Sequence, residues 1–314
     1  MDFRTQNSGI AWAYTAITQR ARLAMGTLRE PREFEEHLFQ DVYMDETSQT
    51  GARFLAIGGI VFPRLYASKF EQSIIDARGN RLPTTHPNGE PRKIKWETVG
   101  RGDYEAYKPV VDAFFEFKKR MQVTSLHSCK FHCNVVDTHI HRRSYATGQK
   151  GQLGFEREIY YYCLLLAQSY YKKNLFHVYP DDRHWRTEPR DLSLIMNRGI
   201  KLQGDARDYP FRRFRPRKAW EVQALQVADI LLGALVYRFN NRYDATEATP
   251  DKRLLCDYIL KRGCALDHIK RNGVKSKNWG DYTIHVRKHP EVKKGPAAPH
   301  PDRPSRWRAK TANS

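Results

Sequence analysis

Three aspartates stand in, or at the end of, segments that are otherwise apolar. Asp229 lies in the middle of the helix-like run 220–235, Asp45 ends the strand-like run 42–46, and Asp181 follows the short run 175–179. Carboxylates are rarely buried unless they are paired, protonated or bound to a metal. Three carboxylates from separate elements can hold Mg²⁺ or Mn²⁺, because these ions prefer hard oxygen ligands.

The chemistry expected of such a set is phosphodiester hydrolysis. Without a cation, carboxylates brought close together raise each other's pKa and resist joint ionisation. A bound metal pair relieves this repulsion, activates water and stabilises the leaving oxygen. We therefore predict a divalent-metal-dependent nuclease with Asp45, Asp181 and Asp229 as its metal ligands.

Each aspartate also has a structural interpretation. Asp45 could cap the turn that follows it, and either Asp181 or Asp182 could belong to a turn after Pro180. Gln226 and Asp229 are i,i+3 neighbours on the helix, so they could form a solvated seam instead of a site. Glu46 points to the opposite face from Asp45 if the strand stays regular.

Net charge is the second strong signal. The chain of 314 residues has a formal net charge of +19, which favours a polyanionic partner such as nucleic acid. The segment 198–218 carries eight Lys or Arg residues against two Asp. It is either a solvated basic loop or a nucleic-acid groove that binds phosphates and stacks Phe211 or Phe214 on unpaired bases. The predicted nucleic-acid contacts are Lys95, Arg207, Arg212, Arg213, Arg215, Arg217, Lys218, Phe211 and Phe214.

The five cysteines are an odd number and suggest no disulfide framework, which favours a reducing cytoplasm. Charged residues interrupt the N-terminal segment, so we expect no signal peptide, and no apolar run approaches the length of a membrane span.

His and Cys residues crowd the stretch 127–141, but their spacing matches no common zinc finger. We regard strand residues and a basic loop as the better interpretation. His132 or His177 could still transfer protons if it lies near the metals.

Hydrophobic periodicity predicts the elements that must position these residues. Strands are expected over 41–46, 53–62, 123–136 and 175–179. Helices are expected over 10–38, 65–78, 103–121, 154–173 and 220–235, and a helix with a short strand over 251–286. Stretches 78–92 and 138–153 have loop composition.

This order predicts an α/β domain, a mixed sheet flanked by helices. Four parts are expected: a helical N-terminal extension (1–40), a core (41–240), a C-terminal helix and strand addition (241–286) and a disordered basic tail (287–314).

Several of these segments resemble a bacterial and phage family, the domain of unknown function numbered 3800. The similar segments are 43–47 followed by 54–62, the Lys-Trp element at 94–96, the strand 177–181 ending in Asp, and the Gln-x-Ala-Asp helix 225–231. The resemblance covers roughly residues 41–240, and the last motif is the most specific.

The resemblance implies an RNase H-like fold with Asp45, Asp181 and Asp229 as the acidic set and Glu46 and Gln226 beside them. It also implies a link to phage defence or mobile elements. The alternative function is a non-catalytic nucleic-acid-binding subunit of a larger defence complex. A homo-oligomer is a further expectation, and no membrane partner is expected.

Overall fold

The computed structural model describes residues 39–47, 52–120, 129–140, 149–182, 185 and 187–287, without the side chains of residue 118 and of 149–154. All structural statements below concern these residues. The expected N-terminal helix 10–38 and the expected tail beyond residue 287 lie outside them.

One mixed sheet of seven strands forms the centre of the fold, in the order β5-β4-β1-β2-β3-β7-β6. β1, β2 and β3 form an antiparallel meander, while β4 joins β1 and β7 joins β3 in parallel. All ten residues of β2 are buried, as expected for a strand inside the sheet with both faces covered. The strands are β1 (Phe39–Thr47), β2 (Phe54–Pro63), β3 (Lys130–Asp137), β4 (Leu175–Pro180), β5 (Phe211–Phe214), β6 (Lys277–Asn278) and β7 (Tyr282–Val286).

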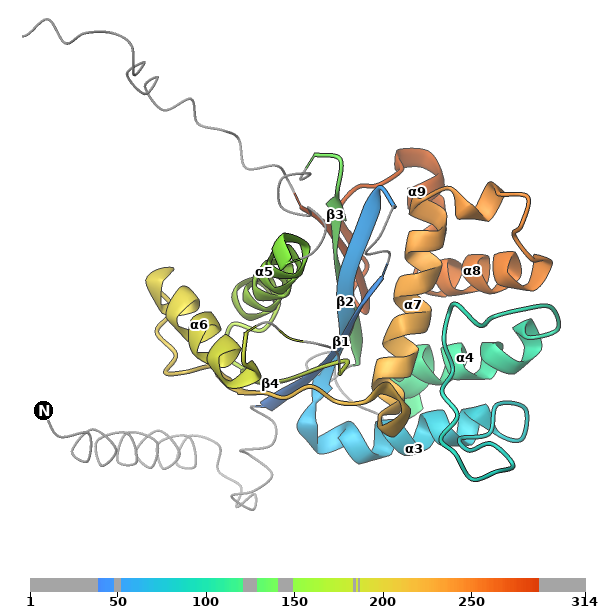
Figure 1. Cartoon of the computed structure of the whole chain (residues 1–314), viewed down its shortest axis with the longest axis horizontal. Coiled ribbons are helices and arrows are strands. Elements are labelled where there is room, and N and C mark those ends of the chain that lie inside the picture. Colours follow the sequence, from blue (N-terminus) through green and yellow to red (C-terminus); the bar gives the residue numbers. More distant parts are fainter. Residues whose placement is uncertain are drawn as a thin grey trace, which may run out of the picture.

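Helices cover both faces of the sheet (Figure 1). One layer contains α3 (Ala67–Arg78), α4 (Tyr104–Arg120), α7 (Gln223–Phe239), α8 (Pro250–Arg262) and α9 (Leu266–Asn272). The other contains α5 (Gln149–Leu165), continued by a π-helical turn (Leu166–Tyr170), and α6 (Pro189–Leu202). Alternate residues of β1 supply the two cores: Tyr43 packs in the α7 layer, and Val42 and Met44 pack in the α5 layer.

The parallel pairing of β1 with β4 sets the geometry of the site. Tyr43 is aligned with Tyr179 and Met44 with Pro180, and the N–H of Asp181 donates to the Met44 carbonyl at 3.1 Å. Asp45 and Asp181 therefore lie side by side one residue beyond the aligned pair, with Asp45 still paired to Gly58 of β2 and Asp181 just past the end of β4.

Most predicted elements are confirmed within the described residues, and two differ; the first part of the expected strand 123–136 lies outside these residues. The segment 149–153, expected as loop, begins α5. The basic segment 198–218 is no single loop, since it holds the end of α6 and the strand β5. In the expected C-terminal addition 241–286, the strand β7 pairs with β3 inside the same sheet.

No helix in the described part of the chain combines the length and the apolar character needed to cross a membrane.

Candidate active site

The three predicted aspartates line one cavity of about 470 Å³ at the edge of the sheet where β1 and β4 end. We call it the carboxylate cavity. Asp45 comes from β1, Asp181 directly follows β4, and Asp229 lies in the middle of α7. The structure thus brings together side chains that are up to 184 positions apart in the sequence.

Asp229 is held by a backbone donor and by a close packing contact. Within α7, every residue except Asp229 and Arg238 is buried, because the helix lies between the sheet and the outer helices. The Trp96 N–H donates to Oδ2 of Asp229 at 2.7 Å. One turn along α7, a Cβ at Gly233 would lie 2.0 Å from Cγ of Trp96. Gly233 is therefore the residue that lets Trp96 approach α7 and orient Asp229.

Asp181 is fixed from two sides. Its Oδ1 accepts hydrogen bonds from the N–H of Asp182 and the N–H of Ala219, both at 3.0 Å. Ala219 belongs to residues 215–222, the segment between β5 and α7, which we call the strap. Asp182 is exposed and does not line the cavity. Of the two candidates left open by the sequence, the geometry favours Asp181.

The electrostatics of the cavity disfavour three ionised aspartates. Burial raises the pKa of Asp45 well above its ordinary range, and the charges of Glu46, Asp229 and Asp181 raise it further. Burial also raises the pKa of Asp229, although the Trp96 N–H and then Lys95 counteract it. Burial also raises the pKa of Asp181, whereas its two backbone N–H donors and the charges of Lys93 and Lys95 lower it. A bound cation would remove this penalty.

Gln226 is buried, and hydrogen bonds occupy its amide. Its Oε1 accepts from the Ile94 N–H at 2.7 Å and from Arg78 at 3.1 Å, and its Nε2 donates to the Ala219 carbonyl at 2.9 Å. These bonds tie α7 to the strap and to the segment that carries Lys95 and Trp96. The geometry assigns Gln226 a positioning role beside the aspartates.

Cations face the carboxylates across the cavity. Lys95 lines it as expected, with Glu46 and Glu97 among the neighbouring acids. Lys252 and Arg242 also line it, and sequence reasoning missed both. The ammonium of Lys252 lies 5.3 Å from the centre of the Trp96 ring and donates to the Glu97 carbonyl at 3.2 Å. No motif marks these cations, because they come from elements that follow α7 and fold back over it.

The donor chemistry fits a divalent cation, since the aspartates offer hard oxygen ligands in a partly buried cavity. As they stand, however, no three Asp, Glu, His or Cys side chains among the described residues are grouped closely enough to hold a metal ion. Metal binding therefore stays a prediction.

The structure corrects the expected nucleic-acid groove at three residues. Phe211 and Phe214 are 2% and 6% exposed, in the core between the sheet and α6, so they cannot stack on bases in this conformation. Arg207 pairs with Asp205 at 2.6 Å and donates to carbonyls of the loop before β4, which is a structural role. The arginines at 212, 213 and 215 and Lys218 are exposed, and Arg217 is half-buried.

Neither histidine singled out in the sequence lies in the carboxylate cavity. His132 is buried against the Tyr171 hydroxyl at 3.0 Å, and burial lowers its pKa to about 3. Nδ1 of His177 lies 3.5 Å from Oδ1 of Asp41. Asp41 precedes Asp45 by four residues on β1 and does not line the carboxylate cavity. His127 and His141 fall outside the described residues.

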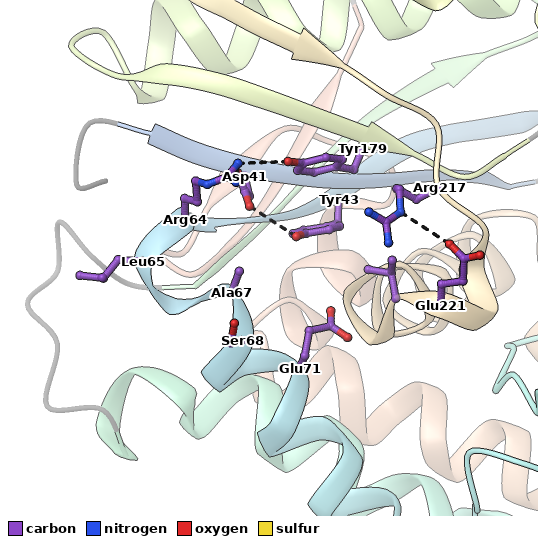
Figure 2. A pocket seen from close by; sticks show the side chains of 11 residues that line it. Asp41, Tyr43, Arg64, Leu65, Ala67, Ser68, Glu71, Tyr179, Arg217 and Glu221 are labelled. Atoms are coloured by element: carbon purple, nitrogen blue, oxygen red, sulfur yellow. Dashed lines mark hydrogen bonds and ion pairs between the residues drawn. The ribbon is translucent and has the colours of Figure 1, made fainter. Parts of the chain in front are cut away.

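A second cavity of about 420 Å³ is lined in part by Arg217, Glu221 and Val222 of the strap (Figure 2). Asp41, Tyr43 and Tyr179 of the strands face Glu71 of α3 across it, and Glu71 accepts the first N–H groups of α7 at 2.7 and 3.1 Å. Arg217 and Glu221 of the strap close it and pair with each other at 3.7 Å. The strap therefore borders both cavities.

Comparison with family models, curated proteins and solved structures gives no match for this chain. The resemblance to the family of unknown function thus stays a prediction.

Proposed function

We propose that the chain is a metal-dependent nuclease that hydrolyses phosphodiesters of RNA or DNA. The observation that carries the proposal is the carboxylate cavity, in which Asp45, Asp181 and Asp229 meet opposite Lys95 and Lys252. Mg²⁺ or Mn²⁺ held there would activate water for attack on phosphorus. The lysines are placed to neutralise a bound phosphate.

We also propose an RNase H-like core for β1 to β5. A three-stranded antiparallel meander, with two further strands joined in parallel beside its first strand, supports this proposal. So does the position of the acids at the ends of the adjacent strands β1 and β4 and on the helix packed over them. A role in phage defence rests on the family resemblance alone.

Within this function the polar residues of the site would have three tasks. Asp45, Asp181 and Asp229 would bind the metal, while backbone N–H groups hold one oxygen of each carboxylate in place. Glu46, next to Asp45 at the cavity wall, would add negative charge that strengthens cation binding. Gln226 would keep the strap and α7 at a fixed separation.

The test is cleavage of end-labelled single- and double-stranded RNA and DNA in Mg²⁺, Mn²⁺ or chelator. Asp229→Asn keeps an acceptor for the Trp96 N–H but loses the charge, so we expect cleavage to fall at least ~100-fold. Asp182→Asn is the matched control and should cut like the wild type. Undiminished cutting by Asp229→Asn, or cutting in chelator, would refute the proposal.

The second candidate is a nucleic-acid-binding subunit whose acids are structural. It is favoured by the net charge of +19 and by the lack of a ready three-ligand group among the described residues. Such a subunit would bind nucleic acid equally well with and without chelator and would never cut it. A nuclease that requires a partner would also be inactive alone, but it would regain cutting when purified together with that partner.

A further inference from the structure

Trp220 stands out on the strap because its large side chain is left 39% exposed. The ammonium groups of two lysines lie over its ring: that of Lys93 is 5.1 Å and that of Lys218 is 5.2 Å from the ring centre. Lys218 precedes Trp220 by two residues, whereas Lys93 comes from the distant segment before Trp96. An exposed indole with two ammonium groups is thus assembled by the fold.

This cluster is tied to the carboxylate cavity. Ala219, directly before Trp220, donates its N–H to Asp181 at 3.0 Å. Lys93 lies two residues before Lys95, and the charges of both lysines lower the pKa of Asp181. On the other flank, Glu221 and Arg217 point into the second cavity (Figure 2). Trp220 therefore directly follows Ala219, which lines the carboxylate cavity and anchors Asp181.

We infer that Trp220, Lys93 and Lys218 form a stacking platform for an unpaired base, and hence that the substrate is single-stranded nucleic acid. This inference rests on the proposed function for its biological meaning. A base that stacks on the indole would displace the ammonium groups from the ring, and the two lysines would then supply the positive charge that the flanking phosphates require. A base inside a duplex has both of its faces occupied by neighbouring bases, so it cannot use the platform.

The platform takes over the role that the sequence suggested for Phe211 and Phe214. Phe211 and Phe214 belong to β5 and their rings are buried, whereas Trp220 is partly exposed and follows the end of this strand by six residues. Its position next to the Asp181 anchor would place a stacked nucleotide close to the phosphate that the acids act on.

The test is binding in chelator, so that it does not depend on cutting. The probes are fluorescein-labelled oligothymidylate and oligouridylate, with a blunt DNA duplex for comparison, read by anisotropy. Trp220→Ala should weaken binding of the single strands by ~10-fold, and Trp220→Phe should restore most of it, because a phenyl ring still stacks. Binding of the duplex should change less than about twofold for either variant.

Tyr161→Ala is the matched control. Tyr161 is also exposed (41%) and has Arg287 at 4.2 Å from its ring, but it belongs to α5 on the other face of the sheet. Its removal should leave binding unchanged.

The inference is overturned if Trp220→Ala binds single strands like the wild type, if it weakens duplex and single strands equally, or if the wild type prefers the duplex. Because the readout is affinity in chelator, these outcomes are distinct from failure of the nuclease proposal. If the wild type binds single strands but never cuts them, and Trp220→Ala loses this binding, the platform is supported and the nuclease proposal is refuted.

Discussion

At the scale of single residues, Gly233 controls the position of Asp229 through Trp96. The Cβ of Gly233→Ala would lie 2.0 Å from Cγ of Trp96, so the indole must move, and this displacement of Trp96 would draw its backbone N–H away from Oδ2 of Asp229. We expect a loss of stability of about 1–3 kcal/mol, as for other overpacked cores, together with loss of cutting. Urea unfolding and the cleavage assay would measure the two effects.

Gly199→Ala separates these effects. A Cβ there would lie 2.0 Å from the hydroxyl of Tyr160, in the layer of α5 and α6 far from the carboxylates. It should destabilise the fold without abolishing cutting. If both variants cut normally, Trp96 is not the residue that orients Asp229.

Neutralising Asp45 should stabilise the metal-free protein. Its folded pKa lies well above the ordinary 3.8, so between these values the folded chain holds a proton that the unfolded chain has released. The free energy of unfolding therefore falls as pH rises through this window. Asp45→Asn should be more stable than the wild type at pH 8 in chelator and equally stable near pH 3.

Urea titrations at the two pH values would measure this difference, with the exposed Asp182→Asn as control. Added Mg²⁺ should stabilise the wild type and leave Asp45→Asn nearly unaffected, because binding to the folded state alone raises stability. A wild type that is more stable than Asp45→Asn at pH 8 without metal would contradict this account.

At the scale of elements, the strap is the part that joins the substrate surface to the acids. Ala219 is the first residue of the 3₁₀ turn Ala219–Glu221, and Lys218 before it is extended. A proline is tolerated at the first position of a helical turn and after an extended residue, so replacing Ala219 by proline removes its N–H and little else. Ala219→Pro should therefore keep the fold but remove one donor from Asp181, and lower metal affinity or cutting by ~10–100-fold.

Ala219→Gly retains the N–H and is the matched control. Its cutting should stay close to that of the wild type. Metal affinity measured by calorimetry would show whether the loss in Ala219→Pro arises at the acids, and an unchanged affinity together with unchanged cutting would contradict the anchoring role.

Sequence patterns predicted the elements and the acids better than the surface around them. Asp45, Asp181 and Asp229 could be chosen because each interrupts or ends an apolar run of recognisable period. That they share a cavity depends on the parallel register of β1 and β4, which no local pattern encodes. Asn197 of α6 shows the same limit: its amide bonds both backbone groups of Phe211, and part of an apparent basic loop becomes an edge strand with two buried phenylalanines.

At the scale of the whole molecule, the region after residue 240 completes the fold. Leu255, Cys256 and Ile259 of α8 are fully buried, and β7 contributes Tyr282 and Ile284 to the core beside β3. A chain ending at residue 240 would expose this apolar surface and lose Lys252 from the cavity. We expect it to be insoluble or to lack a cooperative unfolding transition in circular dichroism.

A chain ending at residue 287 should retain cooperative unfolding, because it keeps all described elements. If the shorter chain unfolds as cooperatively as the longer one, the region after residue 240 is not needed to complete the core.

The outer strands of the sheet have a consequence for solubility. Within the described residues, β5 and β6 lie at the two edges, and they are only four and two residues long. β5 presents Arg212 and Arg213 to solvent, and β6 is exposed at both of its residues, of which Lys277 is charged. Short, positively charged edges repel the edge of another copy, so the large sheet is protected from growing into an intermolecular aggregate.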